Sequence, residues 1–396
     1  MVIITYANFR FYLLVATVFV SGVSQGMLMP LLSILLEDSG TSSTLNGLNA
    51  AALYIGILIA SPFMEKPTFR FGYKPMLIIG LMVDMISIFL FPFWQNFWFW
   101  FLLRLIIGFG DNMLHFAAQV WIMETSKPEK KGRDIAIYGF SFGLGFAVGP
   151  LMPRLLKFSI YYPFFIVSLI CLAILILMLF LKNDYPDAHF HDQPQDFGVM
   201  KRYKKVILLG WAGLITTFGF GFFESSLNGN FPVFALRHGL NIEDISTLLP
   251  CFVAGGLITQ MPLGSLGDRL GRGRLILIIS FFGSFSFLTA GFIYHSFGGL
   301  MVIFAITGMF IGSLFSLGMT FISDLLPKVL IPLGNILASV AYGIGSMFGP
   351  LIGGSLIKTP GGGFFFGIAG VMFIVFLACL IHNFSYLREK QQSSKM

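Results

Sequence analysis

Long apolar segments, separated by short polar ones, occupy almost the whole chain. Twelve of them have the roughly 20 residues that an α-helix needs to cross about 30 Å of hydrocarbon. They lie near residues 9–36, 45–64, 75–93, 98–123, 134–156, 163–181, 206–231, 245–266, 275–295, 299–323, 333–357 and 364–386. The alternation that marks barrel strands is missing, so we predict an all-α membrane protein with twelve transmembrane helices.

The composition excludes a soluble globular chain. Hydrophobic residues make up 56% of the sequence and charged residues 11%, and the mean hydropathy is +0.84. Ordinary globular domains carry about 25% charged residues. The short polar connections leave no room for a separate water-soluble domain.

The net charge of +7 has a topological explanation rather than a nucleic-acid one. If the N-terminus lies inside, twenty lysines and arginines fall on inner segments and only four on outer ones. Those four are Arg154, Lys157, Arg237 and Lys358. Because inner loops carry the excess of positive charge, we expect a multi-pass protein of the plasma (cell inner) membrane with both termini in the cytoplasm.

Two strings 200 residues apart are nearly the same, GFAVGPL from Gly145 and GSMFGPL from Gly345. Two similar halves are typical of secondary transporters, with the substrate site between them near mid-depth. We expect the small residues to pack helices closely. The helix-packing residues of the repeat are Gly145, Gly149, Pro150, Gly345, Gly349 and Pro350.

The longest polar stretch divides these halves. We predict an N-terminal six-helix bundle at 1–181, a cytoplasmic linker at 182–205, and a C-terminal six-helix bundle with a short cytoplasmic tail at 206–396. The linker holds His189 and His191 beside Asp187 and Asp192, residue types that bind metals. Without a fixed scaffold this pattern favours a flexible linker over a metal or proton sensor.

Motifs for cofactor chemistry are absent from the sequence. It has no P-loop, dinucleotide fingerprint, zinc-ligand spacing or nucleophile elbow. Cys171, Cys251 and Cys379 are single and far apart, so we interpret them as packing residues. We predict that the protein is not an enzyme, uses no metal or cofactor, and depends on an ion gradient or on facilitated diffusion.

The segment GSLGDRLGRGR at Gly264–Arg274 closely resembles the loop between the second and third spans of a half in the major facilitator superfamily. The resemblance covers essentially the whole chain and implies two pseudo-symmetric six-helix bundles, alternating access and, usually, a monomer. It also implies a conformational gate in which Asp268 pairs with basic residues such as Arg269 and Arg272. We expect Gly264 to let two helices approach.

The first-half copy of this loop departs from the family pattern. Phe69 stands at the acid position, Glu65 at the first glycine and Tyr73 at an arginine. We therefore expect a lopsided clasp, with Glu65 as a partial substitute for the missing acid.

Two acids resemble the gate residues of the family. Glu124 and Asp324 lie at the predicted cytoplasmic ends of the fourth and tenth spans. We expect Glu124 to pair with Lys131, and Asp324 with Arg269 or Arg272.

The fourth span carries a polar stripe. Arg104 and Gly108 resemble the family motif R-x-x-x-G-x-G, and Asp111 and His115 continue the same helix face. Asp111 and His115 are four residues apart and can touch, which makes a proton relay plausible. A structural ion pair with neighbouring helices is the alternative, and Arg104 is a candidate for substrate or proton work.

In the second half, Glu224 is the outstanding acid, since phenylalanines surround it in the seventh span. We expect it to carry a proton or to pair with a cationic substrate, and a hydrogen bond between helices is the alternative. Asn228 follows on the same helix, which we expect to break towards Pro232. Gln25 is a candidate cavity residue, whereas Asp84 in the third span is predicted to be structural.

The fifth span, with its glycines up to Gly149 and Pro150, resembles the signature of antiporters. The main hypothesis is therefore a transporter that resembles bacterial twelve-span drug:proton antiporters and exports a small amphipathic molecule in exchange for protons. One alternative is a proton-linked or facilitative importer of a specific nutrient or metabolite, in which Arg104 binds an anionic group. Another is a lipid translocator or a membrane sensor. Expected partners are a small-molecule substrate, protons and the bilayer, and no nucleic acid.

Overall fold

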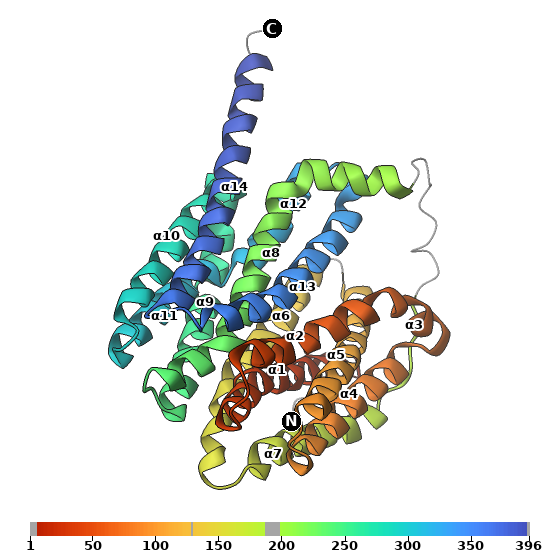
Figure 1. The fold of residues 1–396 in the computed structure, drawn as a ribbon. Coiled ribbons are helices and arrows are strands. Elements are labelled where there is room, and N and C mark those ends of the chain that lie inside the picture. The colour runs from red at the N-terminus through yellow and green to blue at the C-terminus, as the bar shows by residue number, and fades with distance from the viewer. Residues whose placement is uncertain (1–5, 128–129, 187–198, 394–396) are drawn as a thin grey trace. The chain divides into compact units, whose positions relative to one another are not determined.

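The computed structural model describes residues 6–127, 130–186 and 199–393 (Figure 1); in the last of these ranges it describes the side chains of residues 201–384. This part of the chain is helical and has no strand, and it contains twelve helical segments long and apolar enough to cross a membrane. The predicted histidine pair of the linker, His189 and His191, lies outside the described residues.

The described helices divide between two compact units. One unit comprises Met1–Gly40 and Asn49–Gln193, and the other comprises Thr41–Leu48 and Pro194–Met396. The first six spans are α1 (Tyr6–Asp38), α2 (Ser43–Ala60), α4 (Tyr73–Leu90), α5 (Phe97–Thr125), α6 (Lys131–Val148) with the 3₁₀ helix η3 (Gly149–Lys157), and α7 (Tyr161–Leu179). The short helices η1 (Ser61–Phe63), α3 (Glu65–Phe71) and η2 (Phe91–Phe93) connect them.

The second set follows the same plan. Its helices are α8 (Val199–Arg237), α9 (Ile242–Leu270), α10 (Arg272–Ile293), α11 (Phe297–Ile311), α12 (Leu314–Leu325), η5 (Lys328–Leu330), α13 (Ile331–Leu356) and α14 (Gly363–Ser393). Because α8 begins at Val199, the last residues of the segment predicted as a linker are helical.

The repeated glycines pack equivalent helix pairs in the two units. A Cβ on Gly145 of α6 would overlap the Phe19 carbonyl of α1, and a Cβ on Gly345 of α13 would overlap the Phe218 carbonyl of α8. Glycine is therefore required for these backbones to touch. The same sequence repeat builds the α1–α6 and the α8–α13 contacts.

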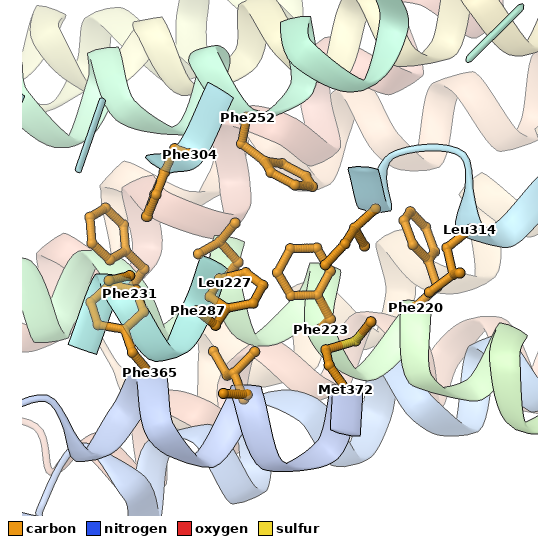
Figure 2. Close-up of a cluster of buried hydrophobic side chains, with 14 of the residues drawn as sticks. Phe220, Phe223, Leu227, Phe231, Phe252, Phe287, Phe304, Leu314, Phe365 and Met372 are labelled. Atoms are coloured by element: carbon orange, nitrogen blue, oxygen red, sulfur yellow. The ribbon is translucent and has the colours of Figure 1, made fainter. Parts of the chain in front are cut away.

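Aromatic side chains fill the core of the second unit (Figure 2). The ring centroid of Phe223 lies 4.8 Å from that of Phe287 and 5.1 Å from that of Phe252. Phe231 and Phe304 form a similar pair at 4.8 Å. Such edge-to-face and tilted ring pairs add stabilisation beyond the area they bury.

Three spans differ from the expected helices. The predicted break in the seventh span is wrong, because α8 runs unbroken to Arg237 with Pro232 inside it. Neighbouring helices in a bundle let a membrane helix tolerate a proline. The tenth span is interrupted between α11 and α12, and the fifth tightens into η3 at its Pro150 end.

Candidate transport site

Asp111 is the centre of a buried polar cluster in the first unit. It lies on α5, which Asn96 caps by accepting hydrogen bonds from the backbone of Trp98 and Phe99. The Asp111 residue is 2% exposed. Its Oδ1 accepts a hydrogen bond of 2.5 Å from Ser21 of α1, and its Oδ2 accepts another from Gln25 Nε2 one turn further along α1. The predicted candidates Asp111 and Gln25 are therefore in direct contact.

A chain of hydrogen bonds extends from this carboxyl towards a more exposed region. Ser21 Oγ lies 2.9 Å from His115 Nε2, and His115 Nδ1 lies 2.6 Å from the Tyr138 hydroxyl. The closest nitrogen–oxygen distance between His115 and Asp111 is 3.5 Å. The His115 side chain is 24% exposed and that of Asp111 only 3%. The stripe on α5 thus brings a partly exposed imidazole to a buried carboxyl.

The donors and acceptors available on these side chains determine the direction of each hydrogen bond. An ionised Asp111 can only accept, so the Ser21 hydroxyl donates its one proton to Asp111, and the imidazole donates from Nε2 to Ser21. A neutral His115 then accepts from Tyr138 at Nδ1, and a charged one donates there. Tyr138, His115, Ser21 and Asp111 form a continuous chain of hydrogen bonds, and the sequence analysis missed Tyr138 and Ser21.

Arg104 does not join this path. It is 1% exposed; its Nη1 donates to Asn49 Oδ1 at 3.3 Å, and its Nη2 lies 3.1 Å from Met29 Sδ. Its Nε has no hydrogen-bond partner among the described residues, and no described carboxylate forms an ion pair with it. A buried guanidinium with neutral neighbours alone is electrostatically incomplete.

Glu224 lies on α8 of the second unit, and its hydrogen-bond partner belongs to a cluster of aromatic rings. Its Oε2 accepts a hydrogen bond of 2.7 Å from the Tyr342 hydroxyl of α13. The ring of Tyr342 lies 6.1 Å from Phe220 and 5.0 Å from Phe315, and these two phenylalanines lie 6.2 Å apart. The amide of Asn228 donates to the Glu224 backbone carbonyl at 2.8 Å. Asn228 therefore supports the helix and not the carboxyl.

The family loop of the second unit centres on Arg272. Its Nη2 donates to Asp268 at 2.8 Å, and its Nη1 donates to Asp324 at 2.5 Å. Arg272 therefore ties the end of α9 to the end of α12. Arg269 is exposed and makes no ion pair within the described residues.

Two expectations about these loops are wrong. A Cβ on Gly264 would meet no atom within 4 Å, so this glycine does not bring two helices together; at Gly273 the nearest atoms would lie 3.0 Å away. Glu124 and Lys131 form no ion pair with each other, although both are described. Nearness of Glu124 and Lys131 in the sequence is not sufficient for their side chains to meet.

The first unit has a clasp that the sequence analysis missed. Arg10 Nη1 donates to Asp184 Oδ2 at 2.7 Å, and Trp121 Nε1 donates to the same oxygen at 3.0 Å. The Arg10 guanidinium stands 5.6 Å from the Trp121 ring centroid. Tyr73 stacks on Trp121 at 5.4 Å, and its amide donates to the Asp184 carbonyl. An acid beyond α7 thus connects α1, α4 and α5.

The geometry defines a class of protein before any comparison is made. Twelve apolar helices, glycine-packed helix pairs at equivalent places in two units, and buried ionisable groups within the spans are the features of a secondary transporter. Such features are typical of membrane proteins that transport small molecules.

Comparison with known proteins identifies the family. The profile of the Major Facilitator Superfamily matches residues 14–250 and 213–395. The chain belongs to the major facilitator superfamily.

Curated relatives and solved structures agree. The chain is 44% identical over 355 residues to the uncharacterized MFS-type transporter YfkF of Bacillus subtilis (strain 168), covering 89% of this chain and 90% of the relative. It is 23% identical over 364 residues to multidrug resistance protein 2 of the same organism, covering 87% and 88%. The fold is similar to that of the nucleoside transporter NupG, with a TM-score of 0.76, 12% identity and coverage of 94% and 99%. It is also similar to a bacterial homologue of the human lysosomal transporter Spinster, with a TM-score of 0.70, 14% identity and 95% coverage of both chains.

Proposed function

We propose that the chain exports amphipathic small molecules across the plasma membrane in exchange for protons. The observation that carries this proposal is the hydrogen-bonded path from Tyr138 through His115 and Ser21 to the buried Asp111. A carboxyl that is out of water but connected to a partly exposed imidazole can take up and release a proton during a transport cycle.

Protonation of Asp111 also has a structural consequence. The ionised carboxyl accepts from both Ser21 and Gln25, which holds α1 against α5. The protonated carboxyl carries a hydrogen of its own and competes with one of those donors. The two protonation states therefore favour different α1–α5 contacts, and a difference of this kind shifts a conformational equilibrium.

The second unit supports an amphipathic, cationic substrate. The Tyr342 hydroxyl bonds the Glu224 carboxylate, and the rings of Phe220 and Phe315 pack against the Tyr342 ring. Aromatic faces with an adjacent carboxylate attract lipophilic cations. The resemblance to a multidrug resistance protein at 23% identity favours export of such compounds.

Proton exchange driven by a named probe tests the proposal. In proteoliposomes with an acidic lumen, added ethidium should discharge the pH gradient, as followed with a fluorescent pH-gradient dye. Asp111→Asn should abolish this discharge because the amide cannot ionise. Asp134→Asn, at an acid that is 8% exposed and outside the path, is the matched control and should retain it. Unreduced exchange in Asp111→Asn would refute the assignment, provided that ethidium fluorescence anisotropy shows binding by both variants.

Arg104 favours a second candidate, the import of an anionic metabolite. The buried guanidinium has no described carboxylate partner and can bind an anionic group. Uptake of radiolabelled organic acids and sugar phosphates by cells that express the protein would support import if Arg104→Gln abolished it. Uptake that is unchanged in Arg104→Gln, together with ethidium-driven proton exchange, would decide for export.

A further inference from the structure

A second acid, Asp84, lies beside the Asp111 cluster. It belongs to α4, is 2% exposed, and its Oδ1 has no hydrogen-bond partner among the described residues. The proposed proton path does not include it. A buried polar atom without a hydrogen-bond partner lowers the stability of the fold, so the presence of Asp84 at this position requires an explanation.

Close packing of α4 on α5 places the two acids together. A Cβ on Gly110 would stand 3.0 Å from the Gly80 carbonyl oxygen and 2.9 Å from Asp84 Oδ1. Gly110 directly precedes Asp111 in the chain, and Asp84 lies one turn beyond Gly80. The Asp84 and Asp111 carboxyls interact electrostatically in this arrangement.

No basic side chain of the described structure compensates Asp84. Asp84 lies on α4, which packs mainly against α5 and α7. The titratable groups of these two helices that interact with Asp84 are Asp111 and the thiol of Cys171. Arg104, the basic residue deep in α5, bonds instead to Asn49 and Met29. Asp84 therefore interacts electrostatically with one acid and one thiol.

The two carboxyls cannot be ionised together without strong repulsion, because both are out of water. The surroundings of the two carboxyls indicate which of them is ionised. Asp111 receives hydrogen bonds from Ser21 and Gln25, with His115 beside it, so its carboxylate is supported. Asp84 has an unpartnered oxygen, so the neutral acid is the form that it can hold at lower cost.

We propose that Asp84 is a second proton-carrying residue: it holds its proton while Asp111 is ionised, and it gives that proton to water in the open transport pathway once Asp111 has taken up a proton through His115 and Ser21. A proton then passes through the pair without two negative charges in the buried cluster. This inference rests on the proposed proton exchange and adds a residue to its path.

Infrared spectroscopy tests where the proton resides without any substrate. Purified protein in lipid nanodiscs at neutral pH should show the C=O stretching band of a protonated carboxylic acid. Asp84→Asn should remove this contribution from the spectrum. Ser87→Ala, at a buried residue of the same helix, and Asp134→Asn should both leave it in place. A spectrum unchanged by Asp84→Asn would overturn the proposal.

Gly110→Ala provides a second variant that keeps the acid. Its new Cβ would lie 2.9 Å from Asp84 Oδ1, so the band should move in frequency rather than disappear. If Asp84→Asn does not fold, Gly110→Ala replaces it in the experiment. A C=O band at the same frequency as in the unaltered protein would then contradict the proposal.

A transport measurement links the acid to the exchange. Asp84→Asn should slow ethidium-driven proton release at least tenfold, and the double variant with Asp111→Asn should be no slower than Asp111→Asn alone. Undiminished release in Asp84→Asn would remove it from the path. If ethidium drives no proton release even in the unaltered protein, the proposed exchange of this probe fails, and the infrared result still decides whether Asp84 is protonated.

Discussion

At the scale of single residues, the two best-placed acids have different surroundings. Asp111 accepts from a hydroxyl and an amide and lies beside an imidazole, so it is connected for proton transfer. Glu224 receives one tyrosine hydroxyl and otherwise has aromatic neighbours. We infer that the first acid serves the proton and the second serves the substrate.

Tyr138→Phe should slow ethidium-driven proton release roughly tenfold, because a lost hydrogen bond of about 1–1.5 kcal/mol corresponds to that factor. The variant removes only the hydroxyl that bonds His115 Nδ1. Stopped-flow recording with a fluorescent pH-gradient dye measures the rate.

Tyr342→Phe is the matched control for this variant, since it removes the hydroxyl that bonds Glu224 in the other unit. It should weaken ethidium binding more than it slows proton transfer. A Tyr138→Phe protein that releases protons at the unaltered rate would exclude Tyr138 from the path.

The sequence predicted part of this site. The spacing of Asp111 and His115 on one helix predicted their contact, because residues four apart share a helix face. Ser21 and Gln25 reach Asp111 across a helix–helix contact, which no local spacing encodes. Asp84 was predicted to be structural because the third span lies at the periphery of this fold, and nothing in the sequence indicates that Gly80 and Gly110 bring α4 and α5 together.

At the scale of elements, glycines decide which helices touch. The repeat around Gly145 and Gly345 was visible in the sequence, and both glycines lie against the backbone of the first helix of their unit. The prediction for Gly264 was wrong because a glycine within a motif gives no information on whether a neighbour is present. Twelve spans were predictable from hydropathy alone, whereas the continuation of α8 through Pro232 depends on its packing.

Gly145→Ala and Gly345→Ala should each destabilise the protein, because the added Cβ would overlap a carbonyl oxygen of Phe19 or Phe218. Overpacking of this kind costs about 1–3 kcal/mol. Thermal denaturation followed by fluorescence-detected size exclusion should show a lower midpoint for both variants.

Gly139→Ala supplies the control within the same helix. A Cβ at Gly139 would meet no atom within 4 Å, so its denaturation midpoint should stay close to that of the unaltered protein. Equal midpoints for Gly139→Ala and Gly145→Ala would contradict the packing described for α1 and α6.

At the scale of the whole molecule, the two units resemble each other in helix packing. They differ in the hydrogen bonds and ion pairs that connect their helix ends. The second unit uses the family loop, in which Arg272 bonds both Asp268 and Asp324. In the first unit, where Phe69 stands at the acid position, Asp184 bonds Arg10 and Trp121 instead. The sequence showed that the first loop was altered, but it did not identify Asp184, which lies more than a hundred residues further along the chain.

Asp184 should protect the backbone at the start of α4. The amide of Tyr73 donates to the Asp184 carbonyl at 2.9 Å, and that of Lys74 donates to Asn183 Oδ1 at 3.0 Å. Asp184→Ala removes the side-chain bonds that hold this segment. A charge-assisted bond contributes about 1.5–3 kcal/mol, and partial exposure reduces it to about 1 kcal/mol. Amide exchange at Tyr73 and Lys74 should therefore accelerate roughly fivefold in Asp184→Ala, as hydrogen–deuterium exchange mass spectrometry would measure.

The control for this prediction is Asp268→Ala, which removes an acid of the other clasp. Asp268 bonds Arg272 in the second unit, whereas Tyr73 and Lys74 belong to the first unit. The peptide that contains these two residues should exchange at its original rate in Asp268→Ala. Exchange that accelerates equally in both variants would mean that removal of either acid destabilises the protein in general. Exchange that accelerates only in Asp184→Ala would show that the first unit has replaced the missing acid of its loop with one from beyond α7.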